Sequence, residues 1–181
     1  MKSLALKTIF GFANLALLSA LALFGPAWTL RYWQAWVYLL LCGALTLWII
    51  IVLWRRDPEL LARRVKGGPI NETRRSQQMI QSFASIASLA LLVVPSLDHR
   101  FALSRVPTSV VIAGNLLVAL GFLIVHRVFS ENTFTARSIE VAAGQTVIST
   151  GLYAVVRHPM YAGASLILLG TPWPSAPGGD C

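Results

Sequence analysis

Charged residues divide the chain into four long apolar runs. The runs lie between Lys7 and Arg31, between Arg31 and Arg55, from Ser76 to Leu97, and from Val106 to His126, and each has 21 to 23 residues without Asp, Glu, Lys or Arg. A helix needs about 20 predominantly apolar residues to cross a hydrocarbon core of about 30 Å. The pattern therefore predicts four transmembrane helices, over about residues 8–24, 34–54, 78–97 and 108–129.

The composition agrees with an all-α membrane protein. Hydrophobic residues make up 56% of the chain and charged residues 12%, whereas a soluble domain has about 25% charged residues. A further apolar segment, Met160–Thr171, would form only about 18 Å of helix and predicts a truncated fifth membrane helix. We expect a transmembrane region over 1–130 with a cytoplasmic loop at 55–78, a polar segment with the start of the last helix over 131–171, and an irregular tail over 172–181.

Basic residues gather on one side of the predicted membrane. Twelve of the fifteen Lys and Arg residues lie at the N-terminus, between residues 55 and 75, or between residues 127 and 157. An excess of Lys and Arg marks the cytoplasmic side, so we expect a multi-pass protein whose N-terminus and residues 127–157 are cytoplasmic. Because topology accounts for the net charge of +8, this charge does not indicate nucleic-acid binding. Neither cysteine has the spacing of a metal ligand, so no metal site is predicted.

The first cytoplasmic loop contains the signals of a short helix. Asp57 can cap its start, Pro58 suits the first helical position and Gly67 can end it. Leu60 and Leu61 begin a partial apolar face, so we expect this helix to lie on the inner membrane surface. Two roles remain open for it: binding of anionic lipid headgroups and gating of a substrate.

Small residues predict contact faces on two of the membrane helices. Ser82, Ser85 and Ser88 recur at three-residue steps in the third helix, and Gly114 and Gly121 lie seven residues apart in the fourth. Small side chains let membrane helices approach closely. Both sets therefore predict helix–helix contacts. After the fourth helix, apolar and polar residues alternate over 137–141 and 146–149, which predicts a small β-hairpin around Ala143–Gln145.

The segment Gly151–Gly163 concentrates the polar chemistry of the chain. Proline suits the first position of a helix and holds the preceding residue extended, so Pro159 predicts a helix start with His158 near its N-cap. The N-terminus of a helix favours anions, and Arg157 adds a fixed positive charge. Two explanations remain open at this point: an anion-binding site, or the boundary residues of a membrane helix.

The same segment resembles a known family signature. The matching positions are Gly151, Tyr153, Val156, Arg157, His158, Pro159, Tyr161 and Gly163. They resemble the signature of the integral-membrane methyltransferases related to isoprenylcysteine carboxyl methyltransferase and phospholipid N-methyltransferases, with a specific resemblance over about residues 131–170. The resemblance implies a helical membrane enzyme that binds S-adenosylmethionine and methylates a membrane-associated or lipid-soluble acceptor.

The resemblance also assigns roles to individual residues. Six positions are expected to bind the cofactor: Tyr153, Val156, Arg157, His158, Tyr161 and Gly163. Arg157 and His158 are expected to be catalytic as well. We expect the helix start and His158 to hold the methionine end of the cofactor, and Arg157 to hold its carboxylate or an acidic substrate. The implied partners are the lipid bilayer and a lipophilic or lipid-linked acceptor, and the oligomeric state stays open.

The chain departs from the family pattern after Thr171. Members of the family normally continue through a further hydrophobic segment to an acidic cytoplasmic tail that completes the site, whereas residues 172–181 are rich in Pro and Gly. This ending is typical of a truncation or a shifted reading frame, and either would leave the chain without the acidic half of the site, so activity of this chain stays an open question. Two other functions remain open: a membrane reductase with a nicotinamide cofactor, and a non-enzymatic membrane scaffold.

Overall fold

A computed structural model describes residues 2–66, 75–132 and 150–171. The helices in these ranges are α1 (Lys2–Ala27), α2 (Trp33–Arg56), α3 (Pro58–Lys66), α4 (Arg75–Phe101), α5 (Thr108–Glu131), α6 (Leu152–Val155) and α7 (Pro159–Leu169). The described ranges contain no strand, so the prediction of an all-α protein is confirmed. The predicted hairpin and the tail over 172–181 both lie outside the described residues.

Four helices are long and apolar enough to cross a membrane. They are α1, α2, α4 and α5, which confirms the four predicted spans. Each extends beyond its predicted apolar run; α1, for example, begins at Lys2 and continues through Pro26 to Ala27. Backbone hydrogen bonding of a helix does not stop where the hydrocarbon ends, so polar residues lengthen it at the interfaces. The fifth apolar helix, α7, has only 11 residues and agrees with the predicted short helix.

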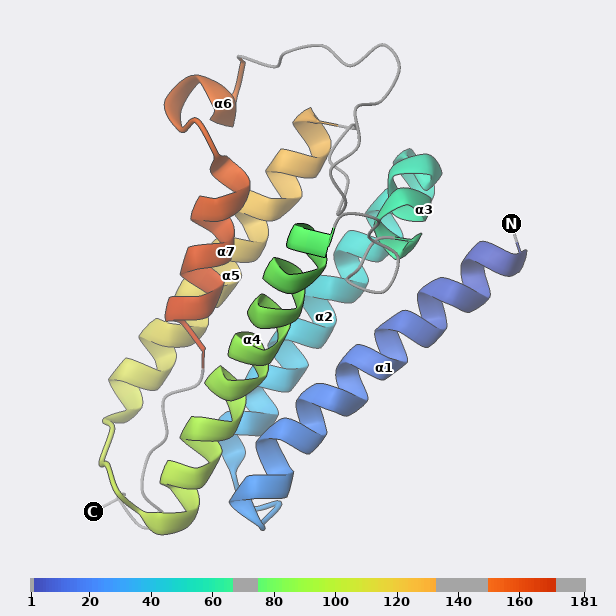
Figure 1. Cartoon of the computed structure of the whole chain (residues 1–181). Helices are drawn as coiled ribbons and strands as arrows, with labels where there is room; N and C mark the ends of the chain where they lie inside the picture. Colours follow the sequence, from blue (N-terminus) through green and yellow to red (C-terminus); the bar gives the residue numbers. More distant parts are fainter. Residues whose placement is uncertain (1, 67–74, 133–149, 172–181) are drawn as a thin grey trace.

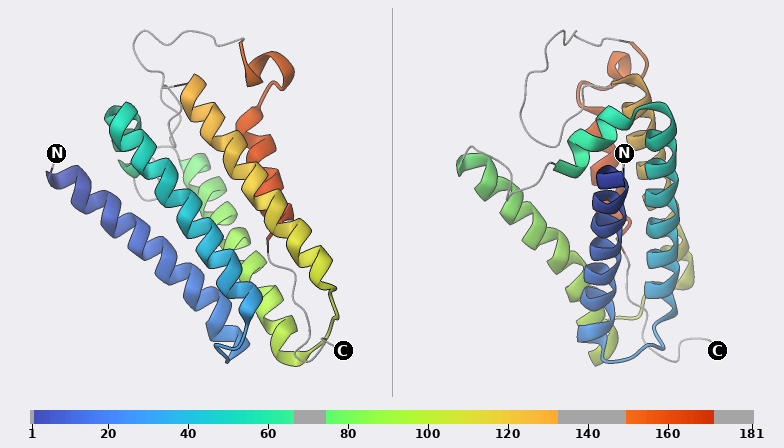
Figure 2. Two further views of the ribbon diagram at one scale, coloured as in Figure 1. Left: turned by 180° about the vertical axis from the view of Figure 1, so that it is seen from behind. Right: turned by 90° about the vertical axis from the view of Figure 1, so that its right-hand side faces the viewer.

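The long helices alternate in direction, which places several chain segments at one end of the bundle. Figures 1 and 2 show the N-terminus, α3 and α6 at the same end, together with the last turn of α5 and the first turn of α7. The described residues of the basic segments recognised in the sequence therefore gather at this end. The two loops that join α1 to α2 and α4 to α5 lie at the opposite end.

The short helix α3 forms as its sequence predicts. The Leu60 N–H donates a hydrogen bond of 2.8 Å to Oδ1 of Asp57, which is the predicted cap. Leu60 and Leu61 are buried in a cluster with Ile49 and Leu53 of α2 and Phe129 of α5. Packing of these leucines holds α3 across the end of the bundle. Gly67, the predicted helix stop, lies outside the described residues.

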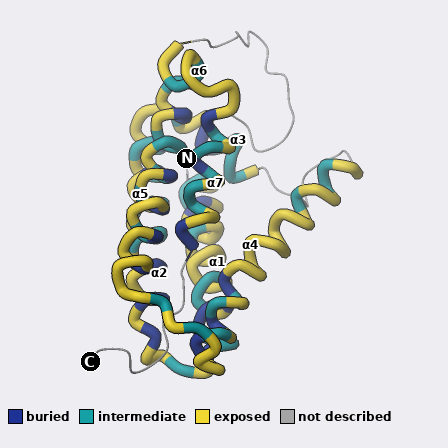
Figure 3. Tube along the Cα trace, turned by 90° about the vertical axis from the view of Figure 1, so that its left-hand side faces the viewer, coloured by how far each residue is buried: buried dark blue, intermediate teal, exposed yellow. Residues whose placement is uncertain are grey.

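The first half of α4 diverges from the bundle (Figure 3). Ser82, Ser85 and Ser88 are exposed, so the prediction that they form a helix contact is wrong within this chain. The hydroxyls of Ser85 and Ser88 instead donate to carbonyl oxygens of the preceding turn, at 2.7 and 2.8 Å. This back-bonding satisfies the hydroxyls without a neighbouring helix. The second half of α4 does contact α1, where Leu92 is buried in the same core cluster as Leu23.

The closest helix pair is α5 and α7, and glycine makes it possible. A Cβ atom on Gly121 would lie 2.6 Å from the carbonyl oxygen of Gly163, and a Cβ on Gly163 would lie 3.0 Å from the carbonyl oxygen of Gly121. Two turns away, a Cβ on Gly170 would overlap the carbonyl oxygen of Gly114. The two backbones therefore touch in an antiparallel arrangement. This finding confirms the predicted contact face of Gly114 and Gly121.

We predict that Gly121→Ala lowers the thermal stability of the protein, whereas Gly43→Ala does not. The added methyl group at Gly121 meets a backbone carbonyl that cannot rotate away, and such overpacking costs about 1 to 3 kcal/mol. A methyl group at Gly43, within α2, meets nothing within 4 Å and gains the higher helix propensity of alanine. Thermal unfolding in detergent gives the unfolding midpoint of each variant. Equal midpoints for the two variants would contradict the backbone contact between Gly121 and Gly163.

Candidate functional site

The C-terminal end of α5 holds the segment that precedes α7. Oε2 of Glu131 accepts a hydrogen bond of 2.9 Å from the Leu152 N–H. Nδ2 of Asn132 donates a hydrogen bond of 3.1 Å to the Tyr153 hydroxyl. Glu131, the last residue of α5, and Asn132, its C-cap residue, thus position the single turn of α6, 21 residues further along the chain.

Gly151 is required at the start of α6 by both conformation and space. Its φ of 59° lies in the left-handed region, which favours glycine. A Cβ at this position would also overlap the Glu131 carboxylate, since it would lie 2.5 Å from Cδ. The glycine of the sequence motif therefore has a structural explanation: it lets the chain turn directly against Glu131.

The structure begins α7 at Pro159, with His158 as its N-cap, as predicted. The N–H groups of Tyr161 and Ala162 donate to the His158 carbonyl oxygen at 3.1 and 3.3 Å, and proline has no N–H. The helix start therefore offers few backbone donors to a ligand. An anion at this position would be held mainly by the side chains of Arg157 and His158.

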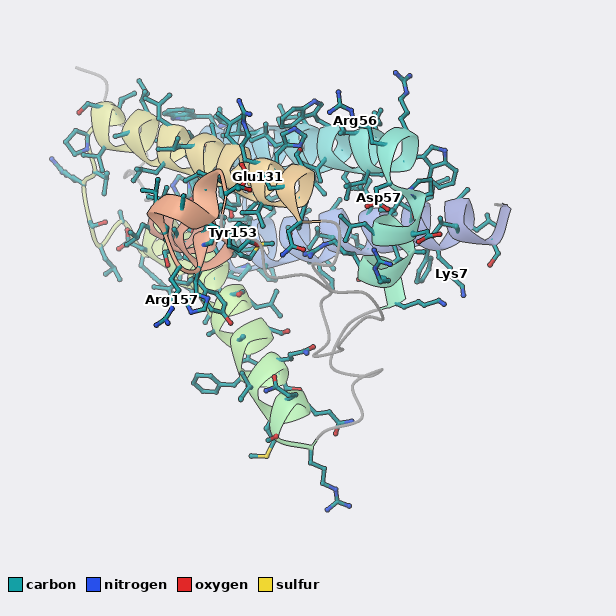
Figure 4. The ribbon with its side chains drawn as sticks, turned by 90° about the horizontal axis from the view of Figure 1, so that it is seen from above. Lys7, Arg56, Asp57, Glu131, Tyr153 and Arg157 are labelled. Atoms are coloured by element: carbon teal, nitrogen blue, oxygen red, sulfur yellow. The ribbon has the colours of Figure 1, made fainter. Side chains whose placement is uncertain are left out.

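Four of the predicted site residues are exposed around the start of α7. Val156, Arg157 and His158 are exposed, and Tyr161 is 71% exposed. The rings of His158 and Tyr161 approach to 5.7 Å between centroids. Figure 4 shows Arg157 beside α6 and near Tyr153 at the end of the bundle. The surface combines a guanidinium, an imidazole and a phenol, which suits a polar ligand with a negative group.

The other two predicted residues are engaged in the protein itself. Tyr153 is partly buried, and its hydroxyl accepts the hydrogen bond from Asn132. Gly163 is buried against Gly121. The close approach of α5 thus explains why a residue without a side chain stands at position 163. Contact of either residue with a cofactor stays a prediction.

The helices around this surface coincide with a family match. Residues 109–173 match the family model described as phospholipid methyltransferase, and this range contains α5, α6 and α7. This part of the chain is therefore similar to membrane methyltransferases. The match covers just over a third of the chain and confirms the predicted relationship to membrane methyltransferases. No curated protein and no solved structure matches the chain significantly.

One residue of the segment that matches the family model, Glu131, was not singled out from the sequence. A negative charge is unfavourable at the C-terminal end of a helix, where the partial charge of the helix is also negative. Glu131 ends α5 nevertheless, because the Leu152 N–H supplies a partner for its carboxylate. An acidic residue at an unfavourable helix position, followed later by a glycine turn, is the signal that could have revealed the contact.

We predict that Glu131→Ala frees the turn of α6, while Glu59→Ala leaves it unchanged. A hydrogen bond to a charged group contributes about 1.5 to 3 kcal/mol, so the Leu152 amide should exchange its hydrogen roughly tenfold faster in the first variant. Glu59 forms a surface ion pair with Arg63, at 3.9 Å, and serves as the matched control. Hydrogen exchange followed by mass spectrometry measures the effect. Unchanged exchange over residues 152–155 in Glu131→Ala would show that the bond does not hold α6.

Proposed function

We propose that this methyltransferase transfers the methyl group of S-adenosylmethionine to a lipophilic, membrane-associated acceptor at the end of the bundle that carries α6. The supporting observation is the exposed group formed by Arg157, His158 and Tyr161 at the start of α7. This group lies within the segment that matches phospholipid methyltransferases. We propose further that this end of the bundle faces the cytoplasm, because the basic residues gather there.

The side chains present fit the polar and charged parts of S-adenosylmethionine. The methionine end of that cofactor carries a carboxylate, and the fork of N–H donors on Arg157 matches carboxylate geometry. His158 adds a second polar contact at the helix start. Tyr161 exposes an aromatic face, which attracts a cation such as a sulfonium group. Gly163 takes part indirectly, since it sets the distance between α7 and α5.

When bound, S-adenosylmethionine supplies a methyl group already activated by its sulfonium. The protein then has to bind the acceptor, orient it and exclude water, and correct positioning alone can remove about 7 to 11 kcal/mol of a barrier. An acceptor carboxylate is nucleophilic without losing a proton. An amine or thiol acceptor has to lose one, and the exposed imidazole of His158 is placed to accept it.

The position of the site favours a lipophilic acceptor. Val155 is 84% exposed and Val156 is 39% exposed, so apolar surface lies directly beside Arg157. From Pro159 onward the chain enters the bundle as an apolar helix. A molecule with an apolar tail in the bilayer and a polar end at the interface can contact both kinds of surface. We therefore propose a lipid or lipid-linked acceptor, with isoprenylcysteine as the specific candidate class.

Binding of labelled S-adenosylmethionine to the purified full chain tests this proposal. We expect Arg157→Ala and His158→Ala each to weaken binding roughly tenfold, because each removes a hydrogen bond to a charged group. Arg55→Ala removes an exposed cation at the same end of the bundle and serves as the control. It should leave the affinity unchanged.

Two results would contradict different parts of the proposal. Absence of binding by the folded wild-type chain would remove S-adenosylmethionine as its cofactor. Binding that survives both Arg157→Ala and His158→Ala would move the site away from the start of α7. Circular dichroism of each variant confirms that the helices are intact before binding is compared.

A further inference from the structure

A groove of about 610 Å³ lies on the other side of α5 from the candidate site, between α1, α2, α3 and α5. Most of its wall is apolar and aromatic, including Phe10, Leu15, Ile49, Leu53 and Phe122. Its volume lies within the range of small-molecule sites, about 300 to 1,000 Å³. The groove exists because α1 diverges from α2 toward its N-terminal end (Figure 1).

Two cations line the groove beside this apolar wall. Lys7 comes from α1 and is exposed, and Arg64 comes from α3. The guanidinium of Arg64 lies over the ring of Phe129, 4.3 Å from its centroid. Among the described residues at the start of α3, Asp57 caps the helix and Glu59 pairs with Arg63. The groove therefore combines an apolar interior with positive charge.

A buried hydroxyl points to a ligand in the same groove. Thr8 lines the groove next to Lys7 and is only 6% exposed. Its Oγ1 has no hydrogen-bond partner within the described part of the chain. A buried hydroxyl without a partner has a free-energy cost, because it has lost its hydrogen bonds to water. An oxygen atom of a bound molecule would remove this cost.

Gly11 marks unfilled space one turn further along α1. It lines the groove, and a Cβ placed on it would meet nothing within 4 Å. A chain of methylene groups can therefore pass beside α1 without displacing any side chain. Along α1 the groove thus presents first the cation of Lys7, then the hydroxyl of Thr8, and then the open apolar space beside Gly11. A membrane lipid has the same order of phosphate, ester oxygens and acyl chain.

We infer that this groove binds one anionic glycerophospholipid of the leaflet at the α3 end of the bundle. Its phosphate contacts Lys7 and Arg64, an ester oxygen accepts from Thr8, and an acyl chain lies along Gly11 and the apolar wall. This lipid is not the methyl acceptor, because the buried cluster of Ile49, Leu53, Leu60, Leu61 and Phe129 stands between the groove and Met160 of α7. Figure 4 shows Lys7 and Arg157 on opposite sides of the molecule.

Native mass spectrometry of the full chain tests the inference without any cofactor. The protein is equilibrated with equal amounts of phosphatidylglycerol and phosphatidylcholine that carry identical acyl chains, and the retained lipid is identified. We expect the wild type to retain phosphatidylglycerol preferentially. In the double variant Lys7→Gln with Arg64→Gln, we expect the preference for phosphatidylglycerol to fall about fivefold for each cation that is removed. The double variant Arg55→Gln with Arg56→Gln, whose cations are exposed and do not line the groove, should keep the preference.

A second pair of variants tests the acyl-chain contact independently of charge. Gly11→Leu fills the open space and should reduce retention of both lipids several-fold, whereas Gly43→Leu, which also meets no neighbour, should not. The inference is wrong if the wild type retains the two lipids equally, if the Arg55 and Arg56 changes abolish the preference as strongly as the groove changes, or if Gly11→Leu retains lipid like the wild type. Should the charge variant fail to fold, the Gly11→Leu result decides alone.

Discussion

The backbone contact between α5 and α7 is the interaction on which the candidate site depends. In a bilayer the lipid tails are as apolar as the side chains, so helices associate through close packing rather than through removal of apolar surface from water. Glycine at positions 114, 121, 163 and 170 supplies that packing by bringing the two backbones together. The same helix, α5, then reaches α6 through Glu131 and Asn132. Both ends of the motif segment are thus attached to one helix, and the exposed residues Arg157 and His158 lie between the two attachments.

This arrangement joins α5, α6 and α7 into one structural unit, and the family match covers these three helices. A segment with only α6 and α7 would lack the partners of Gly151, Leu152 and Gly163. The remaining helices support the pair from the other side, where Met160 packs on the cluster formed by α2, α3 and Phe129. The position of the candidate site is therefore determined by α5, and the other helices of the bundle keep α5 in place.

Much of the fold could be predicted because its causes are local in sequence. Four charge-free runs specify four spans, Asp57 specifies the start of α3, and Pro159 specifies the start of α7. The contact face of Gly114 and Gly121 could also be recognised, although its partner helix could not. The contact between Glu131 and Leu152 was missed because it joins a side chain to a backbone group 21 residues away. The predicted contact of the α4 serines was wrong because small residues permit a helix contact without requiring one. The hydroxyls of Ser85 and Ser88 find their hydrogen-bond acceptors within their own helix.

The short length of α7 has a consequence for the interior of the bundle. Eleven residues give about 16 Å of helix, roughly half of a hydrocarbon core. Polar groups at the end of such a helix therefore lie near the centre of the membrane, where no water can satisfy them. Thr171, which is buried, donates its hydroxyl to the Ile167 carbonyl oxygen at 3.1 Å and also interacts with Tyr38 of α2. The short helix thus ends in a small hydrogen-bonded polar contact inside the bundle, formed by Thr171 and Tyr38.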